Sequence, residues 1–292
     1  MLVEFIAHAG VCIKSKSATI LIDPWFTDST VAQPLIREIV GYPTIDFQIP
    51  KTKKRPSDYQ PDAILLSHFH AHHAPLNDVL ELVGTKKINI LHPHTETVNE
   101  KAREVFKIFP QVTTNPMQSG DGHTLEDMRI TALSHTVNGH TAWHITSPNG
   151  SILHIADPGF NENHSIRKIS ESWSKFKDLR PDVLFINTGG NSLRRETQNG
   201  RSIIDSSSLS PAEAAQVVAF IRPKAVSIIG CYNHSIWRDR EEYIRPASVI
   251  EDEFYWAVSW LAPETKCVFL KPGHTFGLRE ESLSVKVDTF IA

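Results

Sequence analysis

Short apolar runs recur along the chain, and most are bounded by Gly, Pro, Asn, Asp or Ser. Runs of this length and composition are typical of strands buried in a sheet. The clearest is at residues 18–22, where β-branched residues lead into an Asp-Pro pair. The same pattern predicts further strands at residues 2–8, 11–15, 63–66, 88–91, 128–133, 142–146, 151–156, 183–186 and 225–229.

Segments with helical periodicity of their apolar residues alternate with these runs. The best defined begins at Ser210, where Pro211 and Glu213 complete the pattern of a capped helix start. Alternation of strands and helices indicates an α/β fold. Helices are expected at residues 76–83, 95–109, 210–221 and 248–261, with a shorter one at 32–40.

Two stretches lack strong periodicity and are expected to be irregular. Residues 27–60 are rich in Pro and Thr, and a segment of that length often covers a site. Residues 191–208 are polar and are expected to form a loop. No repeat of fixed period and no clear linker interrupts the pattern, and the length of 292 residues suits one large α/β domain or two small ones.

The overall composition is that of an ordinary globular protein of 292 residues, 40% hydrophobic and 22% charged. A net charge of −3 gives no support for nucleic-acid binding or for attraction to an anionic membrane. No apolar run approaches the roughly 20 residues that span a bilayer. The N-terminus shows no secretory signal, so the sequence predicts a cytoplasmic protein.

Histidines far outnumber cysteines in this chain, 15 against 3. The cysteines form neither a CxxC pair nor a disulfide framework, which fits a reducing cytoplasm. If a metal is bound, its ligands are therefore expected to be nitrogen and oxygen donors.

Four of the histidines lie in one short loop, between the strand expected at residues 63–66 and the helix expected at 76–83. A surface cluster that binds nothing is the ordinary alternative. Several imidazoles on a loop at a strand end can, however, face one ion, and imidazole is the commonest metal ligand in proteins. The first candidate metal site therefore consists of His68, His70, His72 and His73.

Other imidazole and acidic side chains also follow expected strands. His135, Asp157 and His234 each lie at or just beyond the end of such a strand. Each has an alternative role as a plain hydrogen-bonding group. His8 and Asp23, at the ends of the first and third strands, either contact a substrate or form a buried hydrogen-bonded pair that braces the site.

The loop cluster resembles the His-x-His-x-Asp-His signature of the metallo-β-lactamase superfamily, with His72 where the signature has Asp. The residues that match the signature are His68, His70 and His73. His8 and residues 20–25 resemble the branch that holds ascorbate-phosphate lactonases, N-acyl-ethanolamine phospholipases and CMP-sialic acid hydroxylases. This resemblance implies a single domain over residues 1–292, folded as an αββα sandwich in which two sheets lie between outer helices.

The resemblance also implies two divalent metal ions. Zinc, iron and manganese are all compatible with nitrogen and oxygen donors. Asp157 is expected to bridge the ions, and His72 either binds the second ion or transfers protons. The implied ligands are His68, His70 and His135 for the first ion and His72, His73 and His234 for the second.

Further side chains are candidates for the rim of the site. Arg194 and Arg195 either hold a carboxylate or phosphate or belong to a solvated loop. His274 is expected to return to the pocket rim. The sequence makes a weaker case for His92, His94, His140, His144 and His154. Of these, His144 and His154 are expected to pack in or beside the sheet.

Three function classes remain open from the sequence. The first is a metal-dependent hydrolase that acts on an ester, lactone, amide or phosphoester bond of a small molecule. The second is a non-haem diiron oxygenase with the same ligands, which would need an external electron donor because the chain lacks the Cys and His motifs of a Rieske cluster. A metal-binding protein without catalysis is the third, and the ordered ligand set argues against it. The oligomeric state is left open.

Overall fold

The computed structural model describes residues 1–26, 53–69, 73, 76–94, 106, 109–134, 140–158, 173–177, 179–188, 192–196, 202–206, 209–231, 234–238 and 241–278. At residues 76, 192–196, 202–206, 234–238 and 241–245 it describes the backbone alone. The helix predicted at 32–40 and most of the helix predicted at 95–109 lie outside these residues.

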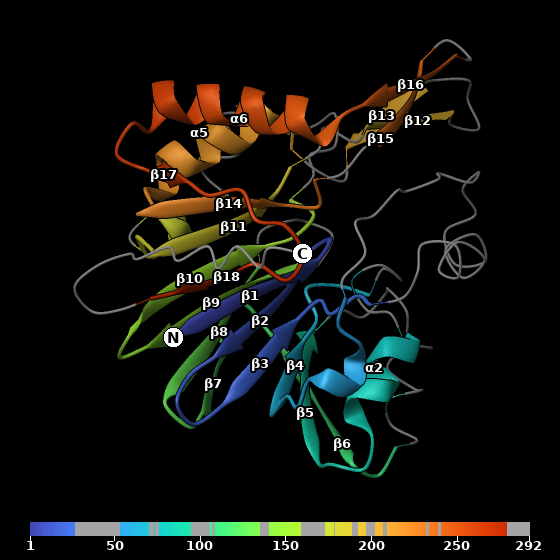
Figure 1. The fold of residues 1–292 in the computed structure, drawn as a ribbon, viewed down its shortest axis with the longest axis vertical. Helices are drawn as coiled ribbons and strands as arrows, with labels where there is room; N and C mark the ends of the chain where they lie inside the picture. Colours follow the sequence, from blue (N-terminus) through green and yellow to red (C-terminus); the bar gives the residue numbers. More distant parts are fainter. Residues whose placement is uncertain are drawn as a thin grey trace.

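Two seven-stranded sheets lie face to face (Figure 1). The first has the order β18 (Thr275–Gly277), β1 (Leu2–Ala7), β2 (Gly10–Lys14), β3 (Thr19–Ile22), β4 (Ala63–Leu65), β5 (Ile88–Pro93) and β6 (Val112–Met117). The second has the order β17 (Lys266–Cys267), β14 (Ala225–Ile229), β11 (Val183–Asn187), β10 (Gly150–Ile155), β9 (Thr141–Ser147), β8 (Met128–Ser134) and β7 (Gly122–Leu125).

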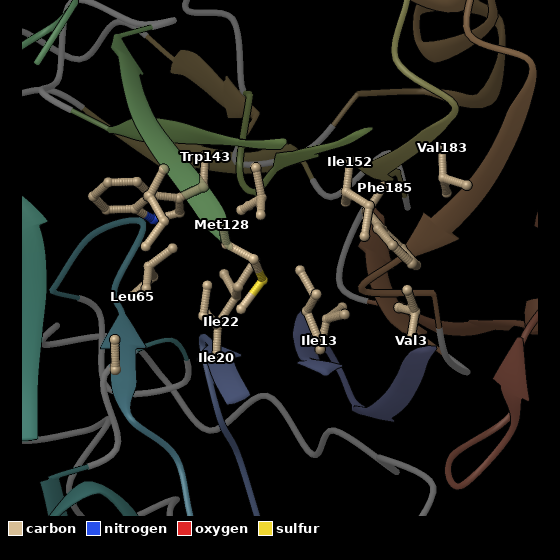
Figure 2. Close-up of a cluster of buried hydrophobic side chains, with 14 of the residues drawn as sticks. Val3, Ile13, Ile20, Ile22, Leu65, Met128, Trp143, Ile152, Val183 and Phe185 are labelled. Atoms are coloured by element: carbon tan, nitrogen blue, oxygen red, sulfur yellow. The ribbon is translucent and has the colours of Figure 1, made fainter. Parts of the chain in front are cut away.

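Alternation along the strands decides which side chains enter the space between the sheets. Ile20 and Ile22 point into the central core, whereas Leu21 lies in the cluster on the outer side of the sheet. Side chains from the second sheet, including Trp143 and Phe185, meet them from the opposite layer (Figure 2). Because both sheets contribute to one core, neither buries its inner face alone.

Helices cover the outer face of each sheet. α2 (Leu76–Val83) packs its apolar side on the first sheet, and α5 (Pro211–Ile221) and α6 (Ala247–Leu261) cover the second (Figure 1). The predicted start of α5 is confirmed, since Ser210 Oγ accepts from the Glu213 backbone N–H and the Glu213 carboxylate accepts from the Ser210 backbone N–H. The arrangement is the αββα sandwich that the resemblance implied.

One prediction of irregular structure is wrong. Residues 191–208 contain the antiparallel strands β12 (Ser192–Glu196) and β13 (Ser202–Ser206) rather than a plain polar loop. A second hairpin of β15 (His234–Arg238) and β16 (Glu241–Arg245) was not predicted, nor were β6 and β7. These segments are mostly polar, so their pairing comes from backbone hydrogen bonds that no apolar pattern marks. Two short 3-10 helices, Pro56–Asp58 and Ser174–Phe176, complete the described elements.

Parallel pairing brings several strand ends to one edge of the sandwich. In the first sheet β3, β4, β5 and β6 are parallel neighbours, and in the second β10, β11, β14 and β17 are. The polar residues that follow these strands therefore meet, as they do at the carboxyl ends of open α/β sheets. In the described part of the chain, no helix combines the length and apolar character that crossing a bilayer requires.

Candidate metal centre

Three side chains that follow parallel strands converge at this edge. His68 lies beyond β4, His73 lies five residues further along the chain, and Asp157 lies beyond β10 of the opposite sheet. Asp157 Oδ2 is 3.4 Å from His68 Nε2 and 3.5 Å from His73 Nε2. One potential ligand atom from each residue falls within 4.8 Å of the others, and all three residues are buried. Nitrogen and oxygen donors so placed form a candidate metal site.

Asp23, at the end of β3, lies behind the two imidazoles and is fully buried. Its Oδ2 is 2.8 Å from His73 Nδ1 and 2.5 Å from Ser67 Oγ, while its Oδ1 accepts from the Ser67 backbone N–H at 2.7 Å. Ser67 Oγ in turn lies 2.9 Å from His68 Nδ1. One carboxylate therefore contacts His73 directly and His68 through a hydroxyl group.

These hydrogen bonds fix which nitrogen of each ring carries a proton. A serine hydroxyl has a single proton, and Ser67 donates it to Asp23, so His68 Nδ1–H must donate to Ser67 Oγ. His73 Nδ1–H donates to the same carboxylate, which accepts only. Both Nε2 atoms are then the coordinating nitrogens, in the arrangement by which carboxylates orient metal-binding histidines.

The electrostatics of the site favour positive charge near His73. Burial lowers the pKa of His73, but the carboxylates of Asp157 and Asp23 outweigh burial and raise it to about 9. A metal that binds Nε2 must displace the proton that the ring holds at neutral pH. The site therefore attracts a cation, either a proton or a metal ion.

Two residues support the centre from the β1–β2 turn and from β10. His8 Nε2 lies 3.3 Å from His73 Nε2, so His8 borders the coordinating face of that ring. His154 is fully buried, as expected, and its Nε2–H donates to the Ala9 carbonyl at 2.8 Å. That bond joins the turn carrying His8 to the opposite sheet, and burial keeps the pKa of His154 below its ordinary value.

Three residues at the candidate metal centre have strained backbone conformations. His8, Asp23 and Asp157 have φ angles of 53°, 42° and 41°, in the left-handed region that non-glycine residues seldom adopt. Each residue lies where a strand has just ended and the chain must turn a side chain towards the site. Such conformations persist at functional sites because surrounding hydrogen bonds hold them.

Three residues that contact the centre were not recognised as site residues from the sequence. The sequence made only a weak case for His140 and none for Ser67 or Asn187. The His140 ring stacks on His68, with centroids 4.0 Å apart and planes 14° apart, and its Nδ1–H donates to the Asp157 carbonyl at 3.1 Å. Asn187, the last residue of β11, donates from Nδ2 to Asp157 Oδ1. A signal existed for Asn187, because it ends an apolar strand as the recognised site residues do.

A cavity of about 240 Å³ lies beside this edge. Thr141, which follows His140, is one of its lining residues, and the Thr141 backbone N–H donates to the Ser67 carbonyl at 2.9 Å. The walls are mainly hydroxyl, amide and imidazole groups. The lining residues are Pro93, His94, Met117, Gln118, Ser119, Ser134 and Thr141.

Comparison with known families identifies the domain that carries this centre. The family model described as the β-lactamase superfamily domain matches residues 2–228 of the chain. The chain belongs to the β-lactamase superfamily. A relative from Pyrobaculum islandicum, named a metal-dependent hydrolase, is 25% identical over 231 residues, which are 77% of this chain and 82% of that protein.

Solved structures of superfamily folds are similar over most of the chain. CmlA, a diiron β-hydroxylase from Streptomyces venezuelae, superposes with a TM-score of 0.63 at 18% identity. The match covers 95% of this chain and 54% of the CmlA chain. A metallo hydrolase from Ignicoccus hospitalis has a TM-score of 0.58 at 16% identity, over 95% of this chain and 99% of that one. At these identities the likeness shows the fold alone.

The remaining residues of the predicted superfamily ligand set are not all placed. His70, His72 and His135 lie outside the described residues. His234 begins β15, and Arg194 and Arg195 lie on β12, but for these only the backbone is described. Their roles stay predictions.

His274 lies just before β18, and its place at the rim of the pocket stays a prediction. Its Nδ1 accepts from the Lys271 backbone N–H at 3.3 Å, and its carbonyl accepts from Phe5 N–H at 3.0 Å. Within the described part of the chain, these contacts attach His274 to the edge of the first sheet. They do not join its ring to the three-donor cluster.

The described residues fit a superfamily metal ion on chemical grounds. The donors are two imidazole nitrogens of fixed tautomer and one carboxylate oxygen, all buried and aimed at one another. A divalent cation at this point would interact favourably with His68 Nε2 and with the negative charge of two buried carboxylates, Asp157 and Asp23.

Proposed function

We propose that this protein is a metal-dependent hydrolase that activates water at a His/Asp centre and cleaves an ester, lactone, amide or phosphoester bond of a small molecule. One observation carries the proposal: hydrogen bonds of His68 to Ser67 and of His73 to Asp23 leave the Nε2 atoms of both rings facing Asp157 Oδ2. The name of the Pyrobaculum islandicum relative supports the reaction class.

Each residue has a defined task in this proposal. A bound divalent ion would lower the pKa of coordinated water towards neutrality and polarise the carbonyl or phosphoryl oxygen of the substrate. His68, His73 and Asp157 would hold the ion, and Asp23 would keep both imidazoles oriented. The dinuclear site we propose is completed by His70, His72, His135 and His234, with Asp157 as the bridge.

The surroundings suit a small polar substrate. The cavity lined by Thr141, the residue after His140, offers hydroxyl, amide and imidazole groups. Lys175, whose Nζ donates to Ser119 Oγ at 3.2 Å, contributes positive charge behind that wall. His8 borders the metal-binding face of His73, and we assign it contact with the substrate or with the attacking water.

An oxygenase is the second candidate. Imidazole and carboxylate donors suit iron as well as zinc, and the same fold serves the diiron β-hydroxylase CmlA. A His in place of the signature Asp at position 72 gives the second site one negative charge fewer. This alternative requires an external electron donor.

Metal analysis combined with two activity assays distinguishes the candidates. Protein purified without added metal is analysed for zinc, manganese and iron, then assayed with ester, lactone, amide and phosphoester substrates and for oxygen consumption with a reductant. We expect zinc or manganese and turnover of one hydrolytic class. Iron, a visible absorption band and oxygen consumption without hydrolysis would instead identify the oxygenase.

Two variants test the site itself. His68→Ala should lose both metal and activity, because one of the converging nitrogens disappears. His123→Ala, on the edge strand β7, is the matched control and should keep both. Full metal content and turnover in His68→Ala would refute the assignment of the centre.

A further inference from the structure

Asn187 is a buried amide whose side chain reaches the candidate metal carboxylate. It ends β11, is 3% exposed, and donates from Nδ2 to Asp157 Oδ1 at 2.5 Å. The other oxygen of the carboxylate, Oδ2, is the one that faces His68 and His73. The two oxygens of Asp157 therefore have different partners, and Asn187 holds the one directed away from the imidazoles.

Gly230 provides the space that Asn187 occupies. It follows β14, the strand next to β11, with φ of +68°. A Cβ on Gly230 would lie 2.6 Å from Asn187 Oδ1 and 2.8 Å from both Cγ and Nδ2. Any side chain at this position would therefore displace the amide. The Gly230 backbone N–H also donates to the His8 carbonyl at 2.8 Å, which fixes the glycine from the other sheet.

We propose that Asn187 is a positioning residue that sets the orientation of the Asp157 carboxylate towards the metal, and that Gly230 is the position that permits it. Without the amide, the carboxylate plane turns more freely about its last torsion, so neither oxygen is held in the direction of the ion. With it, Oδ1 is held by an N–H donor and Oδ2 is directed to the ion. The proposal rests on the metal centre of the proposed function, but not on which bond that centre cleaves.

A purely structural role for Asn187 would have a different consequence. Loss of a buried hydrogen bond would then lower the unfolding temperature and leave metal affinity unchanged. Thr188, the adjacent buried residue, provides the matched control, because its Oγ1 donates to the Leu209 carbonyl at 2.8 Å. Thr188→Val removes a hydrogen bond of the same kind from the same segment.

Metal affinity and metal geometry are the readouts that a structural role does not change. Zinc affinity of the metal-free full chain is measured by competition with a chromophoric chelator, and the visible spectrum is recorded after cobalt loading. Asn187→Leu keeps the number of side-chain heavy atoms and removes the donor, while Asn187→Ala provides a second variant. We expect each to bind zinc about 10 to 100 times more weakly and to shift the cobalt spectrum. Thr188→Val should match the wild type in both readouts.

A double-mutant cycle tests the link to Gly230. Gly230→Ala should weaken zinc binding in the wild-type background, because its Cβ displaces the amide. In the Asn187→Ala background the amide is gone, so the same substitution should leave zinc affinity unchanged while it still lowers the unfolding temperature through its positive φ.

Three results would overturn the proposal. If both Asn187 variants kept the zinc affinity and the cobalt spectrum of the wild type, Asn187 would have no positioning role. If Gly230→Ala reduced zinc affinity equally with and without the Asn187 amide, Gly230 would not act through Asn187. Failure of the wild-type chain to bind zinc or cobalt would refute the metal centre along with it. The expected zinc affinities without any hydrolysis would support this inference and count against the proposed function alone.

Discussion

Asp23 Oδ2 lies 2.8 Å from His73 Nδ1, although 50 residues separate the two along the chain. The contact is fully buried on both sides. Because the same oxygen accepts from Ser67, which holds His68, this one carboxylate sets the orientation of two imidazoles that face Asp157. The sequence analysis offered a buried pair of Asp23 with His8 as one interpretation, whereas the structure shows Asp23 hydrogen-bonded to His73 and Ser67 and His8 beside His73. A direct contact of Asp23 with substrate stays a prediction.

Asp23→Asn is expected to weaken metal binding about 10 to 100 times. The amide cannot accept from Ser67 and His73 with two equivalent oxygens, so at least one imidazole loses its orientation. Zinc affinity by chelator competition is the measurement. Asp62→Asn is the matched control, since Asp62 is an exposed carboxylate that accepts from the Thr19 backbone N–H at 2.8 Å. Equal zinc affinity in Asp23→Asn and the wild type would contradict the orienting role of Asp23.

Asp157→Asn should be as damaging to metal content as loss of a histidine. A carboxylate offsets the charge of the bound cation and a neutral amide does so poorly, while the hydrogen bond from Asn187 is still accepted by the amide oxygen. Metal per chain after dialysis and turnover of the best hydrolytic substrate are the two measurements. Retention of tightly bound metal with normal turnover would show that Asp157 is not a ligand.

His72→Ala is expected to change the metal count from about two per chain to about one, if His72 binds the second ion as we propose. The imidazole stands where the superfamily signature has an anionic ligand, so its loss leaves the second site with too few donors. Elemental analysis of dialysed protein gives the count. The same count in wild type and variant, whether one or two, would exclude ligation by His72.

Metal-free protein should lose stability as the pH rises from about 6.5 to about 9. In the folded chain the pKa of His73 is raised to about 9, above the ordinary value near 6.5, so its proton stabilises the fold fully below pH 6.5. That contribution, on the order of 3 kcal/mol, disappears as the pH passes through 9. Urea unfolding of the metal-free chain at several pH values measures it.

His73→Gln is the control for this pH dependence. The variant lacks the titrating ring, so its stability should fall less over the same pH range. If the free energy of unfolding fell equally with pH in the wild type and the variant, groups other than His73 would be responsible for the pH dependence. Zinc affinity of the wild type should rise with pH over this interval, because the metal competes with the His73 proton.

The sequence by itself determined the α/β class and the central strands of both sheets, and the resemblance to a known superfamily supplied the two-sheet layers. Alternation at residues such as Ile20, Leu21 and Ile22 separates the inner from the outer face of a sheet, and this depends only on the two-residue period of a strand. The cap at Ser210 is equally local. Candidate donors could be named because strand ends are recognisable in sequence, and Asp157 follows one such end.

Only the tertiary structure decided which of these groups meet and what holds them. Asn187 and Asp157 are 30 residues apart and become neighbours because β10 and β11 pair in parallel with a particular register. Gly230 matters through a side chain on the adjacent strand rather than through its own neighbours in sequence. The hairpins of β12–β13 and β15–β16 escaped prediction because polar strands are held by backbone pairing. Register and sheet packing are properties of the whole chain, so no local pattern encodes them.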